Sequence, residues 1–270
     1  MDNRPIGVFD SGLGGLTAVR QLRRLLPGEN IVYFGDTGRV PYGPRSRQTL
    51  RQYAAQDIRF LLSRDVKYIL AACGTVSSTY PPQDAALLPV PFLGVVEPAA
   101  RAAAAATRTK RVGIIGTQAT IRSGSFAQRM QQLVPGVSLF QQACPMFVAL
   151  VENGYTQPGD PVTQLIAHQY LDGLRQAGVD TLILGCTHFP LLEDAIRRVM
   201  GPEVALIDIG SEAARAVQAT LAQQDLLCSR TAGATQFYVS DSVDQFEDAA
   251  RIFLGSVEGG SVQHIAIEDY

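Results

Sequence analysis

Residues 68–76 read Y-I-L-A-A-C-G-T-V, and residues 181–189 read T-L-I-L-G-C-T-H-F. In each stretch an apolar run of strand length ends at a cysteine, Cys73 or Cys186, and a helix-like segment follows. Such a run is typical of a strand that is buried on both faces of a parallel sheet. The two stretches lie in different halves of the chain, and they predict two similar α/β units that each place a thiol at the end of a strand.

The position of these thiols indicates chemistry. A helix N-terminus stabilises a thiolate, so a cysteine between a strand and a helix is placed to ionise. Two such thiols facing each other across one pocket indicate an enzyme that moves protons with two bases. The alternative is a pair of buried structural cysteines, which is common for this residue type. We favour a functional role for Cys73 and Cys186 because small and hydroxyl residues accompany both of them. Cys144 and Cys228 lack that setting and are interpreted as packing residues.

The composition limits the classes of function. Of 270 residues, 46% are hydrophobic and 18% are charged, which is enough to build a core. A net charge of −2 without a basic stripe argues against nucleic-acid binding as the main task. We expect no signal peptide and no membrane span, since no apolar run approaches roughly 18 residues. Four scattered cysteines fit free thiols in a reducing cytoplasm, and three histidines leave little for a zinc site.

Strand-like and helix-like segments alternate along the chain. The expected strands are 6–9, 31–34, 68–72, 92–96, 112–115, 137–141, 181–184 and 204–207. The expected helices are 16–26, 45–63, 97–107, 123–133, 160–177 and 190–199. This alternation predicts two doubly wound α/β domains with parallel sheets. We expect a first domain of residues 1–97 and 211–270 and a second of residues 98–210, with the ligand in the cleft between them, outside the carboxyl ends of the strands.

A glycine-rich loop, D-S-G-L-G-G at residues 10–15, ends the first strand. It has neither the G-K-[ST] of a P-loop nor G-x-G-x-x-G, so a phosphate site is a weak interpretation. We favour a turn that binds a substrate carboxylate, with Asp10 as a charged group beside the chemistry. The alternative is that Asp10 or Ser11 merely caps the helix. A hydroxyl-bearing loop, Gly116-Thr117-Gln118, occupies the matching place in the second half, as in a weak internal repeat.

Two further segments carry candidates. Val40-Pro41-Tyr42-Gly43 can present main-chain N–H groups and the Tyr42 ring to a small ligand, although taken alone an ordinary turn is the better interpretation. His188, two residues after Cys186, can orient or exchange a proton with a group near the thiol. Glu152 is either a solvated carboxylate or a base that acts through a neighbour, and the sequence leaves both open.

Six motifs occur in the order in which bacterial glutamate racemases carry them, and over nearly the whole chain the sequence resembles that family. The motifs are D-S-G-L-G-G (10–15), V-P-Y-G (40–43), A-C-G-T (72–75), T-I-R-S-G (120–124), C-P-M-F-V-A-L-V-E (144–152) and G-C-T-H-F-P-L-L (185–192). The resemblance to the aspartate/glutamate racemase family implies two α/β domains related by a pseudo-twofold axis, with the substrate between them. It implies interconversion of L- and D-glutamate with no pyridoxal phosphate, other cofactor or metal. It also implies a cytoplasmic homodimer that supplies D-glutamate for peptidoglycan, and so for cell wall biogenesis and cell shape.

The resemblance also implies roles for individual residues. Cys73 and Cys186 are expected as the two acid/base thiols, with Asp10 supporting Cys73, and with His188 and Glu152 supporting Cys186. By the same analogy Cys73 takes the proton from D-glutamate and Cys186 takes it from L-glutamate. The residues expected to hold the substrate are Asp10, Ser11, Pro41, Tyr42, Gly43, Gly74, Thr75, Thr187 and His188.

Gly74 departs from the family, which usually has Asn directly after the first cysteine. The lost hydrogen bond to a charged group weakens transition-state binding by about 1.5–3 kcal/mol, unless Ser77 or Ser78 compensates. We expect Asn at this position to clash, either because Gly74 adopts a positive φ or because Val76, Ser77 and Ser78 have repacked into the gap.

Three alternative functions remain on the sequence alone. One is a racemase of a related acidic amino acid. Another is a weakly active or non-catalytic member of the fold that binds an amino acid, which the glycine at position 74 keeps open. The third is a thiol hydrolase or transferase, with Cys186 as the nucleophile and His188 as its base.

Overall fold

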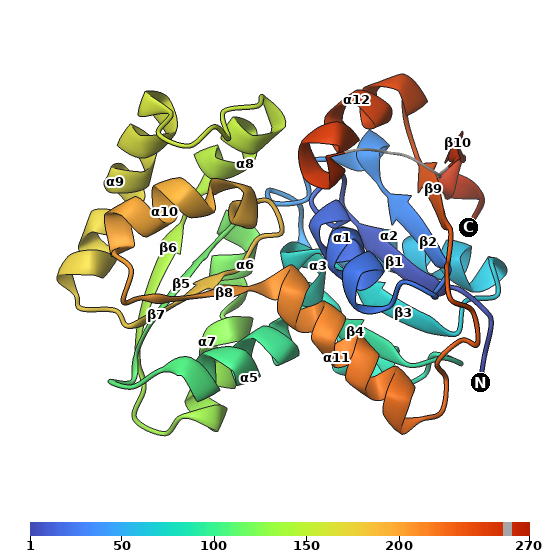
Figure 1. The fold of residues 1–270 in the computed structure, drawn as a ribbon, viewed down its shortest axis with the longest axis horizontal. Coiled ribbons are helices and arrows are strands. Elements are labelled where there is room, and N and C mark those ends of the chain that lie inside the picture. Colours follow the sequence, from blue (N-terminus) through green and yellow to red (C-terminus); the bar gives the residue numbers. More distant parts are fainter. Residues whose placement is uncertain (256–260) are drawn as a thin grey trace.

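A computed structural model of the chain describes residues 1–255 and 261–270. It contains two parallel sheets, which Figure 1 shows in two lobes. The first sheet has six strands in the order β10-β9-β2-β1-β3-β4, and the second has four in the order β6-β5-β7-β8. All of these strand pairs are parallel, which confirms the α/β prediction.

The first sheet takes its strands from both ends of the described chain. These strands are β1 (Ile6–Asp10), β2 (Ile31–Gly35), β3 (Tyr68–Ala71), β4 (Phe92–Gly94), β9 (Thr235–Val239) and β10 (Val262–His264). The helical elements of this lobe are α1 (Leu16–Leu25), η1 (Thr37–Arg39), α2 (Arg47–Ser63), α3 (Gly74–Thr79), α4 (Pro82–Ala85), α11 (Ile209–Gln223), α12 (Val243–Leu254) and η3 (Ile267–Asp269).

The second sheet comes from the middle of the chain. Its strands are β5 (Arg111–Gly116), β6 (Ser138–Ala143), β7 (Thr181–Leu184) and β8 (Ala205–Asp208). Its helical elements are α5 (Val96–Ala106), α6 (Gln118–Ser123), α7 (Ser125–Leu133), α8 (Pro145–Glu152), α9 (Pro161–Gln176), η2 (Phe189–Leu192) and α10 (Glu193–Met200).

The two sheets repeat one strand order. The order β2-β1-β3-β4 in the first sheet matches β6-β5-β7-β8 in the second, with β9 and β10 added at one edge of the first. Cys73 follows β3 and Cys186 follows β7, so the thiols lie after corresponding strands. The chain passes between the sheets twice, from β4 into α5 and from β8 into α11, and α11 packs on α1 (Figure 1). The boundaries near residues 97 and 211 stay a prediction, and residues 256–260 of the predicted tail lie outside the described residues.

Two predicted helices differ in detail. The predicted helix 123–133 is observed as α7, from Ser125 to Leu133. Helix α6, which was not among the expected helices, ends just before it at Gly124, whose left-handed φ of 67° separates the two helices. The segment 190–199 begins as the 3₁₀ turn η2 before α10. Helix α8, over residues 145–152, was not among the expected helices; it is short and largely apolar, so it has no clear helical periodicity to detect.

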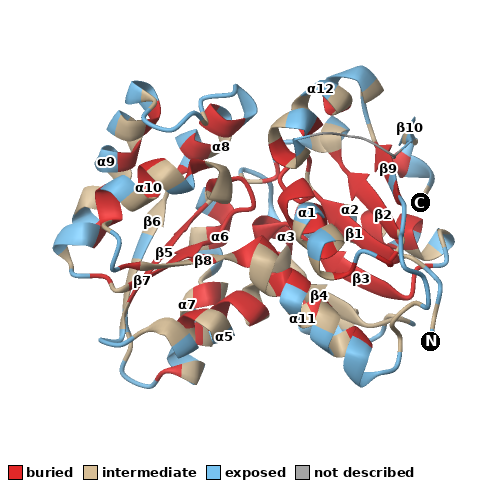
Figure 2. Cartoon of the chain, viewed as in Figure 1, coloured by how far each residue is buried: buried red, intermediate tan, exposed pale blue. Residues whose placement is uncertain are grey.

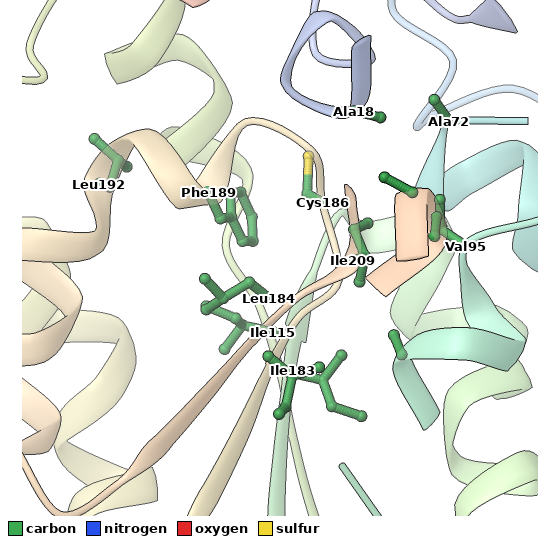
Figure 3. Close-up of a cluster of buried hydrophobic side chains, with 14 of the residues drawn as sticks. Ala18, Ala72, Val95, Ile115, Ile183, Leu184, Cys186, Phe189, Leu192 and Ile209 are labelled. Atoms are coloured by element: carbon green, nitrogen blue, oxygen red, sulfur yellow. The ribbon is translucent and has the colours of Figure 1, made fainter. Parts of the chain in front are cut away.

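The core explains why the apolar runs became strands. All residues of β1, β2, β3 and β7 are buried, as expected for strands with helices on both faces, and Figure 2 shows these strands in red. One cluster of buried apolar side chains extends across both lobes and includes Ala72, Val95 and Cys186. Figure 3 draws Cys186 within this cluster, beyond Ile183 and Leu184 of β7. None of the helices in the described ranges is long and apolar enough to cross a bilayer.

A buried ion pair ties the returning C-terminal segment to the first sheet. The Lys67 ammonium lies 2.6 Å from the Glu29 carboxylate, and both side chains are almost fully buried. The ammonium also donates to the carbonyl oxygens of Asp2 and Leu226, each at 2.7 Å, and the N–H of Cys228 donates to Glu29. The pair therefore joins four segments of the chain, at residues 2, 29, 67 and 226–228.

Replacing Lys67 with Met should strongly destabilise the protein. The change leaves the Glu29 carboxylate buried without its cation, and we expect the free energy of unfolding to fall by about 3–5 kcal/mol. Urea denaturation measures this loss. Arg51→Ala is the control: Arg51 forms an ion pair with Asp84 at the surface of the same lobe, and its removal should cost about 0–1 kcal/mol. Equal losses in the two variants would contradict the assigned role of the buried pair.

Candidate active site

A cavity of about 460 Å³ lies between the two halves of the chain, and it is lined by residues of both. Every residue that the sequence predicted for the site lines this cavity. These residues are Asp10, Ser11, Pro41, Tyr42, Gly43, Cys73, Gly74, Thr75, Glu152, Cys186, Thr187 and His188. The lining also contains ten positions that were not predicted: Gly12, Leu13, Val40, Pro44, Thr117, Gln118, Pro145, Val148, Ala149 and Gly185.

Cys73 is held on the side of the first sheet. The N–H of Ala72 donates to the carbonyl of Phe9 at 2.8 Å, which aligns the end of β3 with β1, and the Cys73 thiol donates to the Ser11 hydroxyl at 3.5 Å. Burial, and after it the Asp10 carboxylate, raises the pKa of the Cys73 thiol to about 12. The N–H of Val76, in the first turn of α3, lowers this pKa as expected for a helix N-terminus, but desolvation and Asp10 outweigh it.

Asp10 is itself a perturbed group. Its side chain is buried at the end of β1, and its carboxylate accepts the N–H of Gly12 at 3.2 Å. Burial raises the pKa of Asp10, and the nearby positive charge of His188 opposes that rise. Asp10, which lies on the side of the first sheet, therefore interacts electrostatically with His188 on the other side of the site.

Cys186 has a different neighbour. Its sulfur lies 3.7 Å from Nδ1 of His188, and Nε2 of His188 lies 3.0 Å from Oε1 of Glu152. Burial lowers the pKa of His188, but the contacts with Cys186 and Glu152 outweigh it and raise that pKa to about 10. The contacts with Cys186 and Glu152 therefore favour the positively charged imidazole. Glu152, whose role the sequence left open, contacts the histidine rather than solvent alone.

Threonine hydroxyls line the contact between the halves. Oγ1 of Thr75 lies 3.1 Å from Oγ1 of Thr117, which lies 3.0 Å from Oγ1 of Thr120. On the other side of the cavity, the Thr17 hydroxyl donates to the carbonyl of Thr187 at 3.1 Å. Thr117 was not predicted as a site residue. The loop of Thr117 is the counterpart of the Asp10 loop in the internal repeat, and this repeat is the sequence signal that points to Thr117.

Glycine permits the two halves to meet closely at Gly74. A Cβ atom on Gly74 would lie 2.4 Å from the carbonyl oxygen of Gly185, the residue that precedes Cys186. The expected clash at this position is therefore supported, but neither expected cause is correct. Gly74 is not in the positive-φ region, and Ser77 does not fill the gap because it bonds the carbonyl of Ala71 and the N–H of Val95. Neither Ser77 nor Ser78 lines the cavity, so neither compensates for the missing amide.

Across residues 1–255 and 261–270, the histidine, cysteine and acidic side chains form no group of three or more that could hold a metal ion. The polar groups around the cavity are instead arranged as a thiol on one side and a thiol with a charged histidine on the other. This arrangement can remove a proton on one face of a small molecule and return one on the opposite face.

The chain is similar to known proteins in both sequence and fold. The model of the Asp/Glu/Hydantoin racemase family matches residues 13–217. A glutamate racemase of Geobacter metallireducens is 44% identical over 266 residues, which make up 98% of this chain and 97% of that protein. The crystal structure of glutamate racemase from Francisella tularensis in complex with D-glutamate matches with a TM-score of 0.90 at 33% identity, covering 100% of both chains. The glutamate racemase of Thermus thermophilus in complex with β-chloro-D-alanine matches with a TM-score of 0.89 at 41% identity, again over 100% of both chains.

The two thiols should differ in reactivity although both are nearly buried. At pH 7 we expect iodoacetamide to alkylate Cys186 faster than Cys73, because His188 is positively charged and because the pKa of Cys73 is about 12. The Cys73 rate should rise about tenfold per pH unit, since only the thiolate reacts. Peptide mass spectrometry measures both rates in a Cys228→Ser background. His188→Asn should slow the alkylation of Cys186 and leave that of Cys73 unchanged. Equal alkylation rates of the two cysteines in the protein with His188 would contradict the predicted difference.

Proposed function

Because the chain belongs to the Asp/Glu/Hydantoin racemase family, we propose that it interconverts L-glutamate and D-glutamate by proton transfer between the α-carbon and two thiols, Cys73 and Cys186. Two observations support glutamate as the substrate of this amino-acid racemase. A relative matched over nearly the whole chain is a glutamate racemase, and a solved glutamate racemase with the same fold is in complex with D-glutamate. The observation that carries the mechanism is the placement of one thiol from each half around a single cavity.

A racemase has to remove a weakly acidic α-hydrogen and return a proton on the other face. In the L-to-D direction, the Cys186 thiolate takes the α-proton and the Cys73 thiol donates its own to the opposite face. Cys186 then ends as a thiol and Cys73 as a thiolate, so the charges balance. The D-to-L direction is the reverse. One base on each face achieves this without turning the substrate over.

The charges around the two thiols favour the start of the L-to-D direction. His188 is positively charged beside Cys186, while burial and Asp10 keep Cys73 protonated. In the other direction Cys73 has to lose its proton. The Ser11 hydroxyl and the main-chain N–H groups of Ser11 and Val76 lower the pKa of Cys73, and they support that thiolate.

In this proposal, hydroxyl groups and main-chain N–H groups donate hydrogen bonds to the substrate. Ser11, Thr75, Thr117 and Thr187 surround the cavity, together with the loop at residues 41–43. Such donors stabilise the negative charge that develops on the substrate carboxylate when the α-proton leaves. Contacts between the halves, including Thr75 with Thr117, close the site and exclude water.

Three parts of the proposal rest on the sequence resemblance. They are the assembly into a homodimer, the location in the cytoplasm, and the supply of D-glutamate for peptidoglycan. Size-exclusion chromatography with light scattering tests the first. Complementation of a D-glutamate auxotroph tests the last, because growth without added D-glutamate requires the product to reach cell-wall synthesis.

Single cysteine variants test the two-thiol mechanism. Cys73→Ser should chiefly impair proton abstraction from D-glutamate and Cys186→Ser that from L-glutamate, and racemisation should fall by about 10³-fold or more in both, because serine is a far weaker acid than cysteine. Solvent deuterium exchange and circular dichroism follow each direction in chelator-treated enzyme without pyridoxal phosphate. Full activity in either variant removes that thiol from the mechanism. An acyl-enzyme without α-deuteration would indicate a thiol hydrolase instead.

Gly74→Ala tests whether the close approach of the two halves is needed for activity. The added Cβ would push the Gly185 carbonyl, and Cys186 after it, away from Cys73, and we expect kcat/KM for glutamate to fall by about 10–100-fold. Gly173→Ala is the control, since no atom lies within 4 Å of a Cβ added there. Gly74→Asn should behave like the Ala variant. A clear gain in kcat/KM on Gly74→Asn would show that the glycine merely lacks a hydrogen-bond donor.

A further inference from the structure

A buried polar cluster lies directly behind the loop that forms one wall of the cavity. Its carboxyl groups are Asp36, which follows β2, and Asp57 of α2, and both side chains are fully buried. Arg39 of η1 bridges them: Nε donates to Oδ2 of Asp36 at 2.6 Å, and Nη2 donates to Oδ1 of Asp57 at 2.9 Å. The Arg39 guanidinium also donates to Gln56 at 2.6 Å and lies 4.1 Å above the ring of Tyr53.

Tyr42 connects this cluster to the cavity. Its hydroxyl donates to Oδ2 of Asp36 and lies 3.3 Å from Oδ2 of Asp57. Tyr42 is 2% exposed, whereas its neighbours Val40, Pro41 and Pro44 are exposed, so it is the buried anchor of the loop. The hydroxyl therefore points to the carboxyl groups, and the loop faces the substrate with its main chain and its remaining side-chain surface.

The two carboxyl groups have different hydrogen-bond surroundings. Asp36 accepts from Arg39, from Tyr42 and, at 2.7 Å, from the Ser240 hydroxyl, which satisfies a carboxylate. Among the described residues, the Tyr42 oxygen at 3.3 Å is the one hydrogen-bond partner of Oδ2 of Asp57. One guanidinium balances one carboxylate, and a second buried negative charge would have no counterion. Burial, and after it the charge of Asp36, raises the pKa of Asp57 well above its usual range.

We propose that Asp36, Arg39 and Asp57 are positioning residues that fix Tyr42, and through it the substrate loop 40–44, with Asp57 in the neutral form. Asp57 then donates its proton to the Tyr42 oxygen, while the Tyr42 hydroxyl donates to the Asp36 carboxylate. Neutral Asp57, ionised Asp36 and positively charged Arg39 leave the buried cluster without net charge. The assignment of the loop to substrate binding rests on the proposed function; the assignment of the loop anchor does not.

The two acids should respond differently to the same change. Asp57→Asn keeps a neutral group that accepts from Arg39 and donates to Tyr42, so KM for glutamate should stay within about threefold of the parent enzyme. Asp36→Asn removes the carboxylate that holds both Tyr42 and Arg39, and KM should rise by about tenfold or more with a smaller change in kcat. Tyr42→Phe, which deletes only the anchoring hydroxyl, should also raise KM. If Asp36→Asn does not fold, Tyr42→Phe carries this comparison.

A matched control separates positioning from stability. Glu29→Gln alters another buried, ion-paired acid of the same lobe. Glu29 does not line the cavity, so this change should lower the free energy of unfolding without changing KM. An Asp57→Asn variant that raises KM as much as Asp36→Asn would overturn the neutral assignment. A Tyr42→Phe variant with unchanged KM would overturn the positioning role.

Tryptic cleavage tests the anchor without any activity measurement. Arg45 and Arg47 are exposed at the end of the loop, so release of Tyr42 should speed cleavage there. We expect Asp36→Asn and Tyr42→Phe to be cut at least about fivefold faster than the parent or Asp57→Asn under native conditions. Equal cleavage rates in all four proteins would refute the anchor. Absence of glutamate racemisation in the parent enzyme would instead refute the proposed function and leave the cleavage result standing.

Discussion

The close approach of Gly74 to the carbonyl oxygen of Gly185 is the constraint on which the site depends. Each of these glycines lies directly beside a catalytic candidate, Cys73 or Cys186, and no side chain separates the two backbones. The thiols can share one cavity only because the ends of β3 and β7 meet in this way. A side chain at position 74 would have to displace the Gly185 carbonyl, so the contact between the two halves depends on glycine at this position.

Around that contact, burial makes the two thiols unequal. Both lie behind strands with equivalent places in their sheets, yet Cys73 faces Asp10 while Cys186 faces a histidine whose positive charge is held by Glu152. A repeated fold has therefore been given opposite electrostatics on its two sides. This difference suits a reaction in which one thiol takes a proton and the other supplies one, because the resting site already distinguishes the two roles.

Buried charges also hold irregular segments of the first lobe in place. The Lys67–Glu29 pair fastens the returning C-terminal segment to the first sheet, and the cluster of Asp36, Arg39 and Asp57 lies under the substrate loop. Such groups are costly to bury and are strongly destabilising when only one partner is removed. Glu29 and Lys67 precede strands β2 and β3, whereas Asp36 follows β2, so specific polar contacts hold irregular segments at both ends of the strands of the first sheet.

The sequence by itself determined the parallel α/β class and the repeat, because apolar runs depend only on neighbours in the chain. Its resemblance to the racemase family implied the twelve proposed site residues, all of which line the cavity. Tertiary structure alone decided that burial and Asp10 raise the pKa of the Cys73 thiol, that Glu152 contacts His188, and that Thr117 joins the lining. It also decided why Gly74 cannot carry a side chain. Each of these depends on burial or on a contact between residues far apart in sequence, and desolvation and long-range approach leave no pattern in a local stretch of amino acids.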